Sequence, residues 1–308
     1  MSTNSPNISP GESLSGTAHR LRRLRARRLP GFQSSTLRSF IDRIETFDLA
    51  FDPEDRGEVE KWYEWGRKQF DQIVEIGPIE QLPSYAPPAN GKTVVWYHKT
   101  IIISRQNPGK EYKINFARAC YTTKVWCNGQ LMTDVDGQTV HISGFSSFSY
   151  DLSPALNATG KIELVVRVEN TDDPALCRGK QSSTLHARDG IWYNQASGLW
   201  GQVTLEEVSS NRLRSDVTGF ADLFNGQVKL NPITYIKNPG EYQLEVIVDS
   251  PEKQRIVSYR QYLQLEPGQQ NHELSFVVPR PQAWSPSTPT LYEVEVNLRQ
   301  DDKLLDRV

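Results

Sequence analysis

Hydrophobic residues in this chain recur with a period of two, the repeat of a β-strand. Within Lys161–Glu169, Ile162, Leu164, Val166 and Val168 fall on one side and mostly charged residues fall on the other. Strict alternation of this kind is typical of a half-buried antiparallel strand. Because a helical repeat is nearly absent from the rest of the chain, the sequence predicts an all-β fold.

The strand candidates form two groups that differ in spacing. They are Val94–Ile103, Tyr112–Phe116, Thr122–Cys127 and Ile162–Val168, and then, after Val208, Gln227–Tyr235, Tyr242–Val248, Tyr259–Leu265, His272–Val277 and Tyr292–Leu298. Asn128-Gly129 predicts a hairpin with a type I′ turn, which requires two positive φ angles. The pattern predicts a larger jelly-roll β-sandwich followed by an immunoglobulin-like β-sandwich.

The length of 308 residues leaves room for about two domains. Residues 1–43, rich in Ser, Pro, Gly and Arg, are expected to be a disordered basic leader, although Leu37–Ile44 is compatible with a short helix. We assign residues 44–207 to the first sandwich, 208–299 to the second, and 300–308 to a linker stub.

Charge and composition place the chain among ordinary globular proteins, with a net charge of -2 and 23% charged residues. Neither a nucleic acid nor a membrane is expected as a partner. The arginines of the leader fit a solvated tail better than a transit peptide or a nucleic-acid-binding arm.

The expected compartment is the cytoplasm. The N-terminus lacks the apolar run of a secretion signal, and no stretch is long and apolar enough to span a bilayer. Cys120, Cys127 and Cys177 cannot all pair with one another, so free thiols and a reducing environment are expected.

The sequence shows no catalytic carboxylate pair. The acidic dipeptides Glu54-Asp55, Asp172-Asp173 and Asp301-Asp302 lie in turn-like surroundings, where solvated loop acids are the rule. The histidines do not have the spacing of metal ligands. No catalytic residue, metal site or cofactor is therefore expected.

The segment Arg178–Glu206 carries the most distinctive motifs. It contains a basic turn, Arg178-Gly179-Lys180-Gln181, then an aromatic patch, Ile191-Trp192-Tyr193, and a tight corner, Ser197-Gly198-Leu199-Trp200, before a strand. The arrangement resembles the sugar-binding domain of glycoside hydrolase family 2, the family of β-galactosidases, β-glucuronidases and β-mannosidases.

Four further stretches are similar to segments of the same family. They are Phe47–Trp62, Val94–Tyr97, His141–Phe145 with Phe148 and Asp151, and Trp284-Ser285-Pro286 with Pro289, Leu291 and Tyr292. The resemblance extends from about Ile44 to the C-terminus and implies the two sandwiches that the strand pattern predicts.

In that family the sandwiches precede a (β/α)8 barrel that holds two catalytic glutamates, the acid/base directly after an asparagine. No Asn-Glu dipeptide occurs in this sequence. The resemblance therefore implies the N-terminal portion of an enzyme that hydrolyses O-glycosyl bonds, truncated before the barrel and inactive alone. A separately encoded barrel is a possible partner; the alternative is a stand-alone carbohydrate-binding or protein-interaction module.

The candidate carbohydrate-binding residues lie in one loop. They are Asp172, Asp173, Arg178, Lys180, Gln181, Asp189, Trp192 and Tyr193. The family's sugar-contacting aspartate stands six residues before the corner glycine, where this chain has Trp192; Asp189 is the nearest substitute.

Each candidate also has a structural alternative. Asp172 and Asp173 would otherwise make turns, and Trp192 and Tyr193 would otherwise pack rather than stack on a sugar. For Arg178, Lys180 and Gln181, salt bridges that hold the loop against the missing barrel are favoured over hydrogen bonds to a sugar or an acidic partner.

Overall fold

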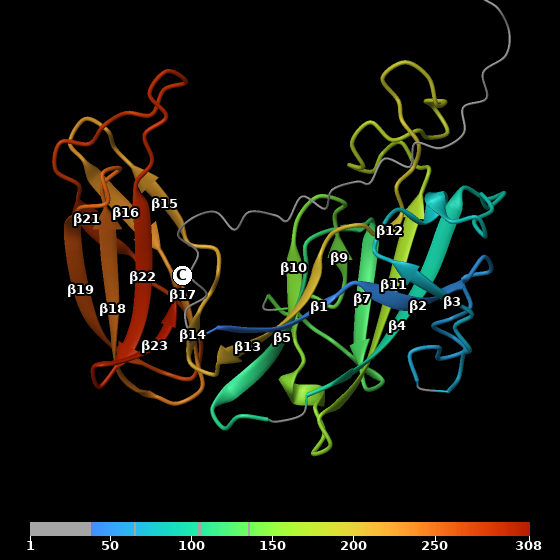
Figure 1. The fold of residues 1–308 in the computed structure, drawn as a ribbon, viewed down its shortest axis with the longest axis horizontal. Coiled ribbons are helices and arrows are strands. Elements are labelled where there is room, and N and C mark those ends of the chain that lie inside the picture. Colours follow the sequence, from blue (N-terminus) through green and yellow to red (C-terminus); the bar gives the residue numbers. More distant parts are fainter. Residues whose placement is uncertain (1–37, 65, 104–105, 135) are drawn as a thin grey trace, which may run out of the picture. The chain divides into compact units, whose positions relative to one another are not determined.

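The computed structural model describes residues 38–64, 66–103, 106–134 and 136–308, and residues 1–37 of the predicted leader lie outside them. The described residues form strands and two short 3-10 helices, η1 (Ile79–Gln81) and η2 (Ser153–Ala155), without an α-helix. The prediction of an all-β fold is confirmed (Figure 1).

The first sandwich consists of two antiparallel sheets. The smaller has the order β1-β13-β5-β10, formed by Ser39–Ile44, Val203–Ser209, Lys110–Phe116 and Phe148–Asp151. The larger has the order β3-β2-β4-β11-β7-β8 with β9 beside β7, formed by Gln72–Glu75, Thr46–Phe51, Lys92–Ile102, Lys161–Thr171, Thr122–Cys127, Gln130–Leu131 and His141–Ile142. A short pair, β6 (Ala119–Cys120) and β12 (Gly198–Leu199), completes this part.

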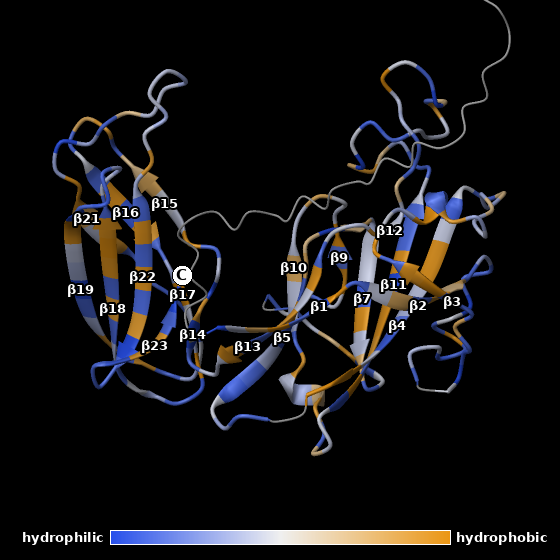
Figure 2. Cartoon of the chain, viewed as in Figure 1, coloured by the Kyte–Doolittle hydropathy of each residue, from blue (hydrophilic) through white to orange (hydrophobic). Residues whose placement is uncertain are grey.

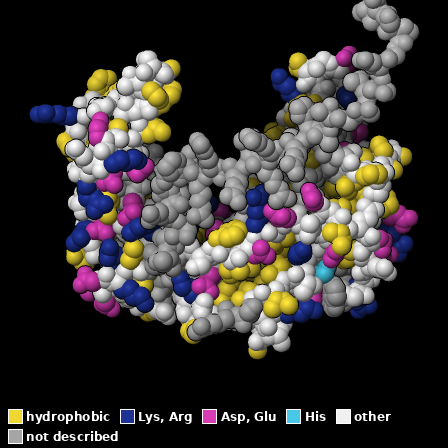
Figure 3. All heavy atoms as spheres, viewed as in Figure 1, with side chains coloured by type: hydrophobic (Ala, Val, Ile, Leu, Met, Phe, Trp, Pro, Cys, Tyr) yellow, Lys and Arg dark blue, Asp and Glu magenta, His cyan; other side chains and the backbone are white. Residues whose placement is uncertain are grey.

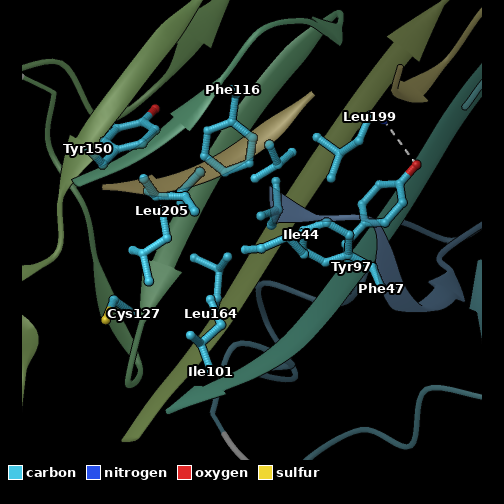
Figure 4. Packing of buried hydrophobic residues seen from close by; sticks show 14 of the residues in the cluster. Ile44, Phe47, Tyr97, Ile101, Phe116, Cys127, Tyr150, Leu164, Leu199 and Leu205 are labelled. Carbon is cyan, nitrogen blue, oxygen red and sulfur yellow. Dashed lines mark hydrogen bonds between the residues drawn. The ribbon is translucent and has the colours of Figure 1, made fainter. Parts of the chain in front are cut away.

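The core of the first sandwich lies between its two sheets. Ile114 and Phe116 of β5 meet Leu164 and Val166 of β11, and all four side chains are fully buried. Figure 4 shows Phe116 and Leu164 in this layer together with Tyr97 and Leu199. The alternation read from the sequence therefore identifies the inner face of β11 correctly.

The outer face of β11 is buried as well, which the alternation does not predict. Trp96 and Trp126 lie on this face with their ring centroids 5.2 Å apart. Trp62 and Tyr63, from the segment between β2 and β3, pack over them. The segment follows the sheet because Asp52 accepts a hydrogen bond of 2.9 Å from the indole N–H of Trp96.

Arg167 shows how charge is accommodated on this covered face. Only 4% of it is exposed, and its guanidinium lies 2.5 Å from Asp55 and 2.7 Å from Glu169. A buried charge of this kind is tolerated because opposite charges surround it.

The second sandwich has three sheets around one core. Their orders are β14-β17-β20, β15-β16-β21 and β19-β18-β22-β23. In chain order the strands are β14 (Arg212–Leu213), β15 (Thr218–Ala221), β16 (Gln227–Asn231), β17 (Ile233–Ile236), β18 (Gly240–Asp249), β19 (Arg255–Leu265), β20 (Gly268–Asn271), β21 (Leu274–Val277), β22 (Glu293–Gln300) and β23 (Lys303–Arg307).

Hydropathy follows the layering of this sandwich. Tyr242, Leu244, Val246 and Val248 point from β18 into the core and are nearly or completely buried. Hydrophobic residues concentrate along the strands, and the connecting loops are mostly polar (Figure 2). Lys, Arg, Asp and Glu side chains are interspersed over the surface of β18, β19 and β22 in view in Figure 3.

Three local predictions differ from the structure. Leu37–Ile44 does not form a helix where it is described, because Ser39–Ile44 is strand β1 and pairs with β13. Gln227–Tyr235 is two strands in different sheets, since Pro232 has no N–H to donate to a ladder. Lys303–Arg307, assigned to a linker stub, pairs with β22 as β23.

The Asn128-Gly129 hairpin is confirmed. The two residues have φ angles of 50° and 78° and connect β7 to β8. All three cysteines are free, as expected, with Cys120 and Cys127 buried and Cys177 exposed. In the part of the chain that the structure describes, we find no helix with the length and apolarity needed to cross a bilayer.

We expect Leu164→Ala to lower the free energy of unfolding by about 2–5 kcal/mol, because it leaves a cavity between the sheets. Ile102→Ala is the matched control: this β4 side chain is 67% exposed, and its loss should change stability by less than about 0.5 kcal/mol. Urea denaturation of both variants measures the difference. Equal midpoints would contradict the packing.

We expect one thiol per native chain to react with a disulfide reagent at pH 8. Burial raises the pKa of Cys127 to about 12 and also raises that of Cys120, so both remain protonated and shielded. Cys177 should react at once, and the other two only in denaturant. Rapid modification of two or three thiols in the native protein would contradict the burial.

Candidate functional site

The loop of residues 172–197 leaves the first sandwich after β11 and returns at a fixed corner. At that corner the backbone N–H of Ser197 donates to both carboxylate oxygens of Glu80, at 3.0 and 2.9 Å. The side-chain amide of Asn170, the penultimate residue of β11, donates to the Ser197 hydroxyl at 2.8 Å. Both ends of the loop are thus tied together and to η1.

The next two residues connect the corner to the core. The backbone N–H of Leu199 donates to the Tyr97 hydroxyl at 3.1 Å (Figure 4). Burial raises the pKa of Tyr97 far above its usual value, so the hydroxyl stays protonated. Gly198 has a φ of 92°, and a Cβ there would lie 2.1 Å from the Tyr97 oxygen. Only glycine fits both the conformation and the space.

Arg178 is buried inside the loop, with 2% of it exposed. One guanidinium nitrogen donates at 3.3 and 3.4 Å to the carbonyls of Asp173 and Ser182, while Nε and Nη1 have no hydrogen-bond partner among the described residues. Burial lowers its pKa, the direction expected for a desolvated cation. In this arrangement the guanidinium of Arg178 braces the loop from within.

Gln181 joins the two arms of the loop. Its side-chain amide donates to the Arg178 carbonyl at 2.9 Å, and its Oε1 accepts a hydrogen bond of 3.0 Å from the N–H of Ala196. Backbone hydrogen bonds from Tyr193 to Lys180 and from Ser182 to Tyr193 extend the connection. Gln181 is therefore another residue that shapes the loop.

The three aspartates take different positions. Asp173 and Asp189 are exposed, and each accepts a backbone hydrogen bond in its own turn, from Ala175 at 2.8 Å and from Gly190 at 2.7 Å. Asp172 packs against Gly91, where a Cβ would lie 2.2 Å from its carboxylate. The turn-forming alternative describes the contacts of Asp173 and Asp189.

The exposed part of the loop is aromatic and polar. Tyr193 is 46% exposed and Phe145, from the neighbouring turn, is 49% exposed; both rings border Gly179. Trp192 is half-buried and stacks on His186, with centroids 3.9 Å apart and planes at 4°. Lys180, the residue after Gly179, is exposed. Aromatic faces beside hydrogen-bonding groups can stack on a sugar ring and bond to its hydroxyl groups.

Two pairs of carboxyl groups in the described residues each share a basic side chain that lies between them. Glu111 and Asp151 both contact the guanidinium of Arg212. Burial, more than the neighbouring Asp151, raises the pKa of Glu111. Asp48 and Glu163 lie on opposite nitrogens of His98. Neither pair is open to a glycosidic bond between its members.

Sequence reasoning missed Glu80, Asn170 and Tyr97, which fix the corner. Each is unremarkable in the sequence, and Glu80 lies 117 positions from its partner Ser197. Only the positive φ required at Gly198 is suggested by the residue type itself.

We expect Glu80→Ala to loosen the 172–197 loop while leaving the sandwich folded. The change leaves the buried Ser197 N–H without its acceptor, which costs about 1–3 kcal/mol. Limited trypsin digestion should then cut faster after Lys180 and Arg188. Glu75→Ala, at an exposed position of β3, is the control, and equal cleavage of both variants would contradict the role of Glu80.

Part of this chain matches a known family, and longer stretches are similar to known proteins. Residues 225–308 match the family model described as glycosyl hydrolases family 2. A β-galactosidase of Bacteroides ovatus is 26% identical over 224 residues, covering 70% of this chain and 24% of the relative. A putative β-glucuronidase of Formosa agariphila is also 26% identical, covering 68% of this chain and 18% of the relative. The chain thus spans about a quarter or less of these relatives.

Solved structures share the fold. A putative β-galactosidase from Bacteroides fragilis superposes with a TM-score of 0.68 at 18% identity, covering 88% of this chain and 40% of that one. A β-glucuronidase from Ruminococcus gnavus gives a TM-score of 0.63 at 16% identity, covering 89% and 45%.

Proposed function

We propose that this chain, which is similar to members of glycosyl hydrolase family 2, supplies the non-catalytic sandwich portion of a glycosidase that acts on β-linked sugars. We propose further that its 172–197 loop contacts carbohydrate. The observation that carries this proposal is the division of the loop into a base bonded to the core at Ser197 and an exposed tip bearing Lys180 and Tyr193.

Among the eight candidate residues, the contacts favour four for sugar binding. Lys180, Asp189, Trp192 and Tyr193 lie at the exposed or half-buried tip. Arg178 and Gln181 are buried and serve the tip by shaping it. Asp172 and Asp173 belong to the turn that leads into the loop.

We propose that these 308 residues alone do not turn over a glycoside. A retaining glycosidase needs two carboxyl groups about 5–5.5 Å apart, one of them protonated. Glu111, whose pKa is raised, faces Asp151 across the guanidinium of Arg212, so a sugar cannot enter between them. Catalysis would come from a barrel in the same protein or on a separate chain.

A stand-alone carbohydrate-binding or protein-interaction module is the second candidate. The free thiols of Cys120, Cys127 and Cys177 support a reducing, cytoplasmic location for either function. A barrel-encoding frame adjoining the gene would favour the glycosidase, and unrelated sequence there would favour the module.

We expect Tyr193→Ala to weaken sugar binding by about 1 kcal/mol, roughly fivefold in Kd, because a ring at the tip is lost. Isothermal titration with galactose, glucuronate and mannose measures the effect. Tyr262→Ala, on the exposed face of β19 in the second sandwich, is the matched control. Unchanged affinity in the Tyr193 variant would contradict a sugar contact there.

We expect the purified chain to release no p-nitrophenol from p-nitrophenyl β-galactoside, β-glucuronide or β-mannoside above the buffer rate. Reproducible hydrolysis that is lost in Glu111→Gln or Asp151→Asn would show that this pair is catalytic and would overturn the proposal.

A further inference from the structure

A hollow of about 270 Å³ lies on the outer face of the first sandwich. Glu64 of the segment between β2 and β3 lines one part of the hollow, and Glu163 of β11 lines another. The remaining lining residues are Asn128 and Gly129 of the β7–β8 turn and Asn157 of the turn before β11. All five are polar or glycine, unlike the aromatic cluster of Trp96 and Trp126 farther along the same face.

Glu163 gives this hollow a fixed acceptor. Only 7% of the residue is exposed, and its Oε2 is held at 2.8 Å by both His98 and Thr100. Its Oε1 is reached, among the described residues, by the ammonium group of Lys161 at 2.5 Å. The Lys161 side chain is 46% exposed, so a ligand can share or displace that contact without disturbing the sheet.

The wall on the other side is equally well fixed. The side-chain amide of Asn128 donates to the carbonyls of Ala155 and Lys161 at 2.9 and 3.2 Å, and its oxygen accepts from the Glu163 N–H at 2.8 Å. Asn157 folds into its own turn, with Oδ1 accepting from Thr159. A preformed wall lowers the ordering cost of binding.

The charges around the hollow favour a neutral ligand over a cation. Arg67 and Lys61 pair with Glu64 at 3.1 and 3.4 Å and lower its pKa. For Glu163, burial opposes ionisation, but hydrogen bonds from Lys161, His98 and Thr100 outweigh burial and lower its pKa. Both carboxylates are therefore ionised, and neighbouring cations already balance their charge. Such groups accept hydrogen bonds from neutral hydroxyl donors.

We propose that this hollow binds a single neutral sugar ring through its hydroxyl groups, as a carbohydrate site separate from the 172–197 loop. Its volume of about 270 Å³ is close to the lower end, roughly 300 Å³, of the range of small-molecule pockets, which favours one ring over an extended chain. Neighbouring hydroxyls would donate to Glu163 and Glu64 and accept from the Asn157 amide.

Titration of the full chain with methyl β-galactoside and methyl β-glucoside, followed by ¹⁵N transverse-relaxation-optimised NMR, tests this site. The amides of Asn128, Gly129 and Asn157 should shift in a saturable way. Glu64→Ala and Glu163→Gln should each weaken that transition at least fivefold. Glu54→Ala, which removes a carboxylate with a 75% exposed side chain, should leave it unchanged.

Melting temperatures identify any variant that fails to fold. If Glu163→Gln fails to fold, Glu64→Ala, at the rim of the hollow, still tests the proposal. Shifts confined to residues 172–197, or no saturable shift at either sugar, would overturn the proposal. Persistence of the Asn128 and Gly129 shifts in Tyr193→Ala would support it, even if the loop itself binds nothing.

Discussion

The antiparallel pairing of β4 with β11 is the constraint on which the rest of the first sandwich depends. The two strands run side by side over their full 11 residues, from Lys92 opposite Thr171 to Ile102 opposite Lys161. Because side chains alternate, this one register sends Tyr97 and Leu164 into the core and Trp96 and Glu163 to the outer face. A slip of one residue would exchange the two sets.

Much of this could be predicted from the sequence, because the information is local. The period of two along Lys161–Glu169 gives the inner face of β11, and Asn128-Gly129 gives the turn. The covering of the outer face could not be predicted, since it depends on Trp62 and Tyr63 meeting residues far along the chain. Pairing across the sheet likewise makes Ser39–Ile44 strand β1, in a segment whose sequence is also compatible with a short helix.

In the candidate site, too, local sequence patterns predict part of the structure and long-range contacts decide the rest. Sequence motifs single out the 172–197 loop, yet residue type alone does not separate the side chains that shape the loop from those that face solvent. Arg178 and Lys180 are both cations two positions apart, but the first is 2% exposed and the second lies on the surface. Glu163 lies on the charged side of the alternating strand, which a half-buried strand would turn toward solvent, whereas the structure buries it at the wall of the outer hollow.

The corner at Gly198 separates a fixed part of the loop from a changeable one. Since the Tyr97 hydroxyl occupies the space where a side chain would begin, the core beneath the loop fixes the shape of its end. The tip beyond it has mainly local hydrogen bonds, so insertions and exchanges there leave the β-sandwich untouched. The outer surface of the loop can thus change while the sheets beneath it keep their packing.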